Sequence, residues 1–260
     1  MTAIGIYDSG IGGISIYNSV KNLLPNEDYI YVADKKYFPY GLRDTETIHK
    51  RGDRIVSWFK QQNVKLIIIA CNTSTVSALE YLRQLHPDIP IVGTVPVIKT
   101  CAKFTKTGKI GVLCTPQTAE SPYQAELIEK FASDKEVYVI ACPNLVEEIE
   151  TGNFKESSAA LSKPLSILLS KDVDTLALGC THFPLITETI KIITGKKIKV
   201  LDSGDAIARQ TKKVLKANKS LNNSNKKGQT LFYTTAKSQN FDIIASRYAG
   251  YKIKSESILI

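Results

Sequence analysis

The sequence lacks long hydrophobic runs, and no stretch of about 18 residues is uninterruptedly apolar, so we expect no membrane-spanning helix. It also lacks a basic segment followed by an apolar one at its start, which excludes an ordinary secretory signal. Together these absences predict a cytoplasmic protein that neither crosses nor enters a membrane.

Cysteines in close pairs are also missing. The chain has five cysteines, all widely spaced: Cys71, Cys101, Cys114, Cys142 and Cys180. Without a close pair, the pattern excludes a zinc knuckle and a redox dithiol, and we expect no metal site. Free thiols in a reducing compartment fit the odd number. Cys101, Cys114 and Cys142 are interpreted as packing residues, because free cysteines are usually buried.

Acidic residues are fewer than basic residues, and the formal net charge is +9. Residues 211–228 contain six lysines and no acid or aromatic residue. Charge alone predicts only non-specific attraction to polyanions, and single-strand binding needs aromatic stacking platforms. We therefore expect no nucleic-acid partner, and we interpret 211–228 as a helix end followed by a mobile loop.

The usual nucleotide-binding fingerprints are absent. Residues 8–13 read Asp-Ser-Gly-Ile-Gly-Gly after a strand, but they match neither G-x-G-x-x-G nor a P-loop. The segment is either a tight strand-to-helix turn or a site whose main-chain N–H groups bind a carboxylate. Both interpretations stay open here.

What is present is a regular alternation of strand and helix patterns, which predicts parallel sheets with right-handed crossovers. The pattern restarts near Pro96, because residues 109–115 resemble residues 3–9. We therefore predict two similar doubly wound α/β domains. The first contains residues 1–97 plus 208–260, since residues 230–235 and a possible edge strand in 250–260 are expected to return to it; the second contains 98–207.

Two cysteines stand where buried strands end. Residues 66–70 are apolar and precede Cys71, and residues 176–179 precede Cys180. Polar residues that favour helix starts follow each one. A thiol at a helix amino end feels the positive end of the dipole, which predicts a lowered pKa for Cys71. Ligands of open α/β sheets bind at such strand ends, so the two cysteines are candidates for a functional pair.

Two thiols with an acid and an imidazole nearby suit proton abstraction next to a carboxylate. One thiolate removes a proton from Cα, and the opposite thiol returns a proton to the other face. A Cys–His hydrolase would need only one cysteine with a triad-like base. His182 lies two residues from Cys180 and can activate or reprotonate that thiol.

Five motifs give the chain a close resemblance to the glutamate racemase family within the aspartate/glutamate racemases, over nearly its whole length. They are Asp-Ser-Gly-Ile-Gly-Gly at 8–13, Pro-Tyr-Gly at 39–41, Ala-Cys-Asn-Thr at 70–73, Gly-Cys-Thr-His-Phe-Pro at 179–184 and Asp-Ser-Gly at 202–204. The resemblance implies an isomerase that interconverts L- and D-glutamate without cofactor for peptidoglycan synthesis. It also implies two α/β domains with the substrate in the cleft between them, and a homodimer.

The resemblance also implies roles for individual residues. Cys71 and Cys180 would be the acid/base pair, assisted by Asp8 and His182 respectively. The substrate would be held by a set of polar residues, which are Asp8, Ser9, Tyr40, Gly41, Asn72, Thr73, Thr181 and His182. Neither pyridoxal phosphate nor a metal would be needed.

A further assisting carboxylate comes from a Cys-Pro-x-x-Val-x-x-x-Glu segment in the family. Here the counted position is Glu150, although Glu147 lies in the same segment and stays an alternative. Two other functions also stay open at this point. One is racemisation of aspartate or another small amino acid, and the other is binding of an anionic amino acid without catalysis.

Overall fold

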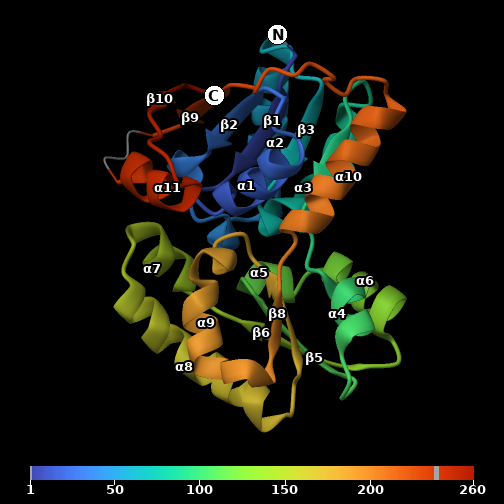
Figure 1. Cartoon of the computed structure of the whole chain (residues 1–260), viewed down its shortest axis with the longest axis vertical. Helices are drawn as coiled ribbons and strands as arrows, with labels where there is room; N and C mark the ends of the chain where they lie inside the picture. The colour runs from blue at the N-terminus through green and yellow to red at the C-terminus, as the bar shows by residue number, and fades with distance from the viewer. Residues whose placement is uncertain (1, 237–239) are drawn as a thin grey trace. The chain divides into compact units, whose positions relative to one another are not determined.

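The computed structural model describes residues 2–236 and 240–260. These residues form two compact units: Met1–Thr94 with Gly204–Ile260 (unit 1), and Val95–Ser203 (unit 2). Each unit contains one parallel sheet flanked by helices (Figure 1), which confirms the predicted α/β class with two parallel-sheet units. The predicted domain limits, 1–97 with 208–260 and 98–207, stay a prediction, and residues 1 and 237–239 lie outside the described residues.

The sheet of unit 1 has the strand order β10-β9-β2-β1-β3-β4, and all of its pairings are parallel. The strands are β1 (Ile4–Asp8), β2 (Tyr29–Ala33), β3 (Leu66–Ile69), β4 (Ile91–Gly93), β9 (Thr230–Thr234) and β10 (Ser255–Ser257). Every residue of β1, β2 and β3 is buried, because helices cover both faces of this central part. The expected edge strand in the tail is confirmed as β10.

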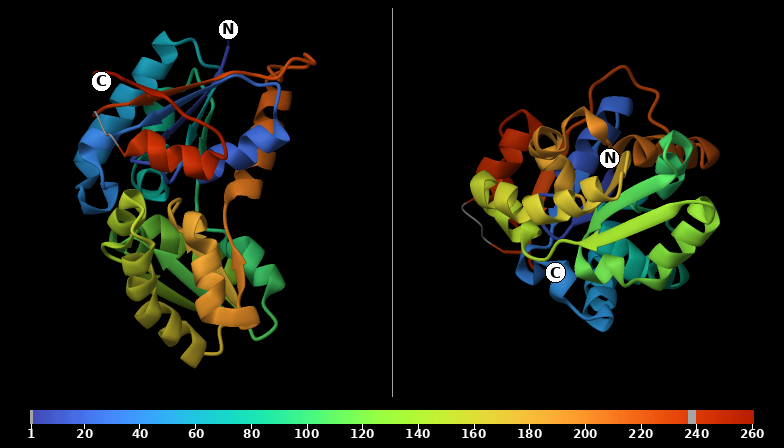
Figure 2. Two further views of the ribbon diagram at one scale, coloured as in Figure 1. Left: turned by 60° about the vertical axis from the view of Figure 1, so that its left-hand side comes forward. Right: turned by 90° about the horizontal axis from the view of Figure 1, so that it is seen from below.

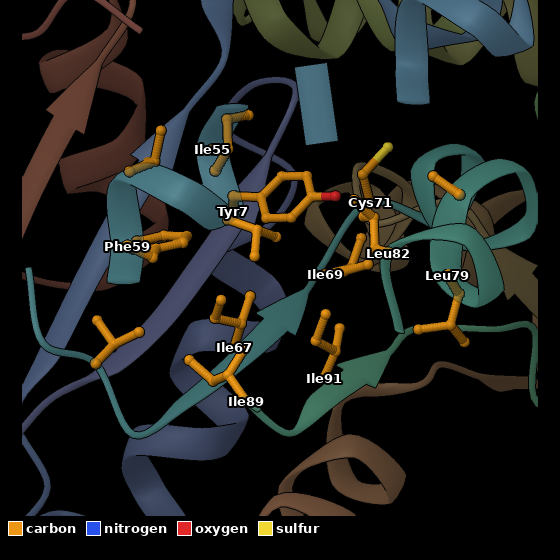
Figure 3. Close-up of a cluster of buried hydrophobic side chains, with 14 of the residues drawn as sticks. Tyr7, Ile55, Phe59, Ile67, Ile69, Cys71, Leu79, Leu82, Ile89 and Ile91 are labelled. Atoms are coloured by element: carbon orange, nitrogen blue, oxygen red, sulfur yellow. The ribbon is translucent and has the colours of Figure 1, made fainter. Parts of the chain in front are cut away.

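Two helices, α2 (Thr45–Gln61) and α3 (Asn72–Leu85), cover one face of this sheet. Figure 3 shows their side chains packed against the odd-numbered strand residues, in a cluster that includes Ile55, Phe59, Leu79, Leu82, Tyr7, Ile67 and Ile69. The helices α1 (Ile14–Leu23), α10 (Gly204–Ala217) and α11 (Phe241–Ala249) pack together on the other face. There Tyr17 makes edge-to-face ring contacts with Tyr29, Tyr31 and Phe232.

The sheet of unit 2 has the order β6-β5-β7-β8 and is also parallel. Its strands are β5 (Lys109–Cys114), β6 (Glu136–Ala141), β7 (Thr175–Gly179) and β8 (Lys199–Leu201). Helices α4 (Ile98–Phe104) and α6 (Pro122–Ala132) cover the face that carries Ile110, Val112 and Cys114. Helix α8 (Phe154–Ser170) covers the opposite face, where Leu168 packs on Gly111; Figure 2 shows helices on both sides of this sheet.

The remaining elements are short helical segments at the strand ends. They are η1 (Lys35–Tyr37), η2 (Tyr40–Leu42), α5 (Pro116–Ala119), α7 (Leu145–Thr151), η3 (Phe183–Ile186), α9 (Thr187–Thr194) and η4 (Gly195–Lys197). No helix in the described part of the chain has both the length and the apolar character needed to cross a membrane.

The segment after α10 differs from the expected mobile loop. The Asn222 main-chain N–H donates to Glu27 Oε1 at 2.7 Å, and its side-chain amide donates to the Asn26 carbonyl at 2.6 Å. The Gly228 N–H donates to the Pro25 carbonyl at 2.9 Å. These non-local bonds attach the segment to the turn between α1 and β2, while residues 223–227 within it are exposed to solvent.

Candidate active site

Cys71 lies one residue beyond the end of β3, after Ala70, and is the N-cap residue of α3. Strand β3 pairs with β1, with Ile69 opposite Tyr7. Because neighbouring parallel strands end at the same edge of a sheet, Cys71 and Asp8 share the carboxyl edge of unit 1. The sequence prediction that an acid lies beside this thiol is therefore matched by the strand register.

The Cys71 thiol is nearly buried, with 6% of the residue exposed. Burial is the main cause that raises its pKa to about 12, and the nearby Asp8 charge raises it further. Hydrogen bonds from the Ser74 N–H and from the side chain and N–H of Ser9 act in the opposite direction. The expected lowering of this pKa is thus wrong, because burial and the Asp8 charge outweigh the hydrogen bonds from Ser74 and Ser9.

The Asp8 carboxylate is fully buried and is held by the turn that follows it. Asp8 Oδ1 accepts a hydrogen bond from the Gly10 N–H at 2.9 Å, and the Tyr31 hydroxyl donates to the Gly10 carbonyl at 2.7 Å. A Cβ atom on Gly13 would lie 2.7 Å from the Asp8 Cβ. The glycines therefore let the start of α1 approach β1 closely and fix Asp8 at the sheet edge, as a tight strand-to-helix turn does.

Other predicted binding residues gather at the same edge of unit 1. Ser9, Asn72 and Thr73 are buried there, and the Asn72 amide donates to the Thr94 carbonyl at 3.3 Å. Tyr40 is buried as well, but its hydroxyl donates to Asp34 Oδ2 at 2.6 Å. Gly41 follows it in η2 and is only partly buried. The Tyr40 hydroxyl is therefore used within unit 1, so we expect the main chain of this segment, and not this hydroxyl, to contact a ligand.

The Tyr7 side chain links the core to this site. Figure 3 shows the Tyr7 hydroxyl pointing toward Cys71, whose sulfur points away from the isoleucine side chains of the core. The same hydroxyl hydrogen-bonds with the Ser74 hydroxyl at 2.9 Å. Burial raises the pKa of Tyr7 far above its ordinary value, so Tyr7 stays neutral. Tyr7 and Ser74 were not singled out in the sequence, where they look like ordinary strand and helix residues.

Cys180 directly follows β7 in unit 2 and has its own set of polar neighbours. Its sulfur lies 3.9 Å from His182 Nδ1, and His182 Nε2 lies 2.6 Å from Glu150 Oε2. Glu150 belongs to α7, and both Glu150 and His182 are almost completely buried. Within unit 2 the structure therefore brings together three of the predicted residues in the order thiol, imidazole, carboxylate.

This order defines which imidazole nitrogen carries the proton. An ionised carboxylate can only accept a hydrogen bond, so His182 Nε2 must be the N–H that donates to Glu150. When the ring is neutral, His182 Nδ1 then presents a lone pair toward Cys180. The arrangement can take a proton from the Cys180 thiol, and the Glu150 carboxylate stabilises the resulting imidazolium.

Two threonines that sequence reasoning did not single out also lie at the carboxyl edge of the unit 2 sheet. Thr115 follows β5, which pairs with β7 so that Cys114 is opposite Gly179. The Thr115 hydroxyl donates to the Thr118 hydroxyl at 3.0 Å, and both residues are buried. The Thr-Pro-x-Thr pattern at a strand end is an N-cap signal that could have identified them. Thr181, which was predicted, is buried at this edge directly after Cys180.

The remaining three cysteines belong to unit 2, where Cys101 has the Thr175 hydroxyl and the Asp174 charge nearby, and Cys114 lies near Cys142. Cys101, Cys114 and Cys142 are buried, and burial raises the pKa of each thiol to about 12. This supports their interpretation as packing residues. Cys71 has a similarly raised pKa, so its position among hydrogen-bond donors at the strand edge distinguishes it, and its pKa does not. In the described ranges, no group of three or more histidine, cysteine or acidic residues could hold a metal ion.

Comparison with known proteins shows the family of this chain. Residues 5–211 match the family described as Asp/Glu/Hydantoin racemase. The chain belongs to this racemase family. Racemases are isomerases, which confirms the predicted enzyme class. The chain is 38% identical over 236 residues to the glutamate racemase of Pseudomonas aeruginosa strain PAO1, covering 90% of this chain and 89% of the relative.

Further members of the racemase family have similar sequences and structures. A glutamate racemase of Clostridium novyi is 38% identical over 234 residues, which is 89% of this chain and 90% of the relative. A crystal structure of a Bacillus anthracis glutamate racemase isoform gives a TM-score of 0.90 at 30% identity, covering 99% of this chain and 97% of that chain. The Francisella tularensis glutamate racemase in complex with D-glutamate gives 0.87 at 31% identity, with the same coverage.

Proposed function

We propose that this chain is a glutamate racemase that interconverts L- and D-glutamate by proton transfer between two cysteines. The observation that carries the proposal is the same in both units: a cysteine ends a central strand and has its own acid/base partner. Cys71 has Asp8 beside it, and Cys180 has the linked His182 and Glu150. Similarity to relatives that are named glutamate racemases supports glutamate as the substrate.

In the proposed reaction, the two thiols act on opposite faces of Cα of one bound substrate. For one enantiomer, the Cys71 thiolate removes the Cα proton and the Cys180 thiol donates a proton to the other face. For the other enantiomer, the roles are exchanged, with His182 accepting the Cys180 proton. A pKa of about 12 means that free Cys71 is a neutral thiol, so we infer that the substrate ammonium group favours its ionised form.

The substrate is held by the polar residues at the two sheet edges. Ser9, Asn72, Thr73 and the main chain of Tyr40 and Gly41 act from unit 1, while Thr181 acts from unit 2. This scheme uses groups of the protein alone and requires neither pyridoxal phosphate nor a metal. We further propose that the product D-glutamate is used for peptidoglycan synthesis and that the enzyme is a homodimer.

The experiment that tests this function uses purified protein in D₂O with L- or D-glutamate and no added cofactor. The optical activity of either enantiomer should decay to zero. Early in the reaction, mass spectrometry should find deuterium at Cα of the product but not in the remaining substrate, because the incoming proton comes from the second thiol. Unchanged optical activity together with no exchange at Cα would reject the proposal. A parallel series with aspartate and smaller amino acids determines the substrate range.

The contact with His182 leads to a prediction that separates the two candidate glutamates of α7. Replacing Glu150 by glutamine should lower kcat/KM roughly 100-fold, because the neutral amide no longer stabilises the imidazolium. Glu147 is partly exposed on the same helix, so Glu147→Gln is the matched control and should stay within about twofold of the wild type. Steady-state kinetics in both directions measures these effects. Equal losses in the two variants would contradict the assignment to Glu150.

The raised pKa of Cys71 leads to a prediction about its reactivity. In the ligand-free folded protein, carbamidomethylation of Cys71 should accelerate about tenfold per pH unit from pH 8 to beyond pH 10, because only the thiolate reacts. In the urea-unfolded chain, the rate should level off above about pH 9, the range of an ordinary thiol. Peptide mapping by mass spectrometry follows Cys71 separately from the other cysteines. A plateau near pH 9 in the folded protein would show that burial does not control this thiol.

A further inference from the structure

A buried carboxylate outside the proposed reaction stands at the same sheet edge as Asp8 and Cys71. Asp34 directly follows β2 and has no exposed surface. Its main-chain N–H donates to the Asp8 carbonyl at 2.8 Å. The two carboxylate oxygens accept four hydrogen bonds: Tyr40 Oη at 2.6 Å and Arg51 Nε at 2.9 Å donate to Oδ2, whereas Arg51 Nη2 at 2.8 Å and Thr235 Oγ1 at 2.7 Å donate to Oδ1.

Arg51, from α2, is almost as deeply buried as Asp34, with 3% of its side chain exposed. It grips Asp34 with two nitrogens, while its Nη1 donates to the main-chain oxygen of Ile260 at 2.7 Å. Its guanidinium carbon lies 4.3 Å from the centre of the Tyr37 ring. A guanidinium held in this way by a carboxylate, a carbonyl and a ring has a single orientation. Asp34 and Arg51 therefore form a rigid pair between β2, α2 and the chain around residues 37–40.

A buried ion pair is weak evidence for stability alone, since desolvation of the two charges offsets much of their attraction. Fixing a local geometry is a better-supported use of such a pair. The group that it fixes here is Tyr40, which belongs to the Pro-Tyr-Gly segment and is fully buried. Tyr40 packs in the same cluster as Tyr7 and Cys71, and the charge of Cys71 contributes to the raised pKa of Tyr40.

We propose that the Asp34–Arg51 pair is a positioning device for substrate binding. Through the Tyr40 hydroxyl, it holds the main chain of Tyr40 and Gly41 at the edge where Cys71 ends β3. That main chain contacts a carboxylate group of the amino-acid substrate. This inference rests on the proposed function, and it assigns to the pair a role in affinity and none in proton transfer.

The test removes the hydrogen bond between Tyr40 and Asp34 and leaves the Asp34–Arg51 ion pair intact. Tyr40→Phe deletes only the hydroxyl that donates to Asp34, and Arg51 and Thr235 still bond both carboxylate oxygens. We expect KM for glutamate to rise about tenfold while kcat stays within about twofold, because a binding contact made equally in ground and transition states is weakened. The dissociation constant from calorimetry should rise by the same factor.

The matched control is Tyr29→Phe. Tyr29 is the first residue of β2, the strand that Asp34 directly follows. Tyr29 is as deeply buried, and its hydroxyl donates to the Leu24 carbonyl at 2.7 Å. Both variants should lower the melting temperature by a few degrees, since each loses one buried hydrogen bond. Only Tyr40→Phe should change KM. Arg51→Lys keeps the charge but loses the two-nitrogen grip, and it should also raise KM with a smaller effect on kcat.

The outcomes separate this inference from the proposed function. If the wild type racemises glutamate but Tyr40→Phe keeps its KM and dissociation constant, the positioning role is wrong and the function stands. Equal KM changes in Tyr40→Phe and Tyr29→Phe would likewise overturn the positioning role, because both changes would then reflect a general loss of stability in unit 1. If the wild type binds glutamate without turnover, the calorimetric comparison still decides the inference. If the wild type does neither, both are rejected.

Discussion

Replacing either Cys71 or Cys180 by serine is expected to lower kcat/KM by about 10²- to 10⁴-fold, the range that a positioned general acid or base contributes. Each thiol is used in both directions, once as base and once as acid. A serine hydroxyl occupies nearly the same place but is a far weaker acid, so it supplies neither role well. Because two enantiomers have equal free energy in water, each variant must lose the same factor with L- and D-glutamate.

The control for this prediction is Cys142→Ser. Cys142 follows β6 as Cys180 follows β7, and it is similarly buried. Its thiol donates to the Ile140 carbonyl, and the hydrogen bonds of the described residues show no imidazole beside it. This variant should racemise within about twofold of the wild type. Rates are measured by the decay of the circular dichroism of each enantiomer. A Cys71→Ser or Cys180→Ser variant that keeps more than about a tenth of the wild-type rate would contradict the two-thiol mechanism.

The sheet edges were predictable because a parallel strand that is buried on both faces has a continuous apolar sequence. Residues 66–70 and 176–179 are apolar runs followed at once by a cysteine and polar helix-starting residues. The strands β3 and β7 end where those runs end, within one residue. Such a pattern is local, and its meaning depends only on burial of both strand faces. By contrast, no strand was predicted in residues 116–173, where β6 is an edge strand whose residues are only partly buried or exposed.

The direction of side chains was less predictable than the position of strands. Counting along the motif left Glu147 and Glu150 as alternatives, and the packing of α7 places Glu150 against His182. The resemblance implied that Tyr40 helps to hold the substrate, but it did not show that the Tyr40 hydroxyl donates to Asp34. Both outcomes depend on how separate elements pack together. Glu150 and His182 are 32 residues apart in the sequence, and Tyr40 and Asp34 are 6 apart.

The thiol pKa shows why a single local rule can mislead. Cys71 does lie at the amino end of α3, as predicted, and the dipole there favours the thiolate. The neighbouring Asp8 was expected, but the effect of burial on this thiol was not readable from the sequence: the residue is buried, and the Asp8 charge lies nearby. Both effects oppose ionisation and together outweigh the hydrogen bonds from Ser9 and Ser74.

The lysine-rich segment was expected to be a mobile loop, and its composition gives no hint of the bonds that attach it. One of these bonds is made by Gly228, whose N–H donates to the Pro25 carbonyl. A Cβ atom at Gly228 would lie 1.8 Å from the Glu27 carbonyl oxygen and 2.3 Å from its carbon. These are main-chain atoms of the turn that leads into β2, so they cannot move aside as a flexible side chain does.

Gly228→Ala is therefore expected to lower the free energy of unfolding by about 3 kcal/mol or more, since the segment must leave the turn and lose its bonds. Gly250→Ala is the control in the same unit. Gly250 has a φ of 77° but no atom within 4 Å of the added Cβ, so only backbone strain of about 1 kcal/mol applies. Urea unfolding followed by circular dichroism measures both. Similar losses in the two variants would show that this close approach to Glu27 does not contribute to stability.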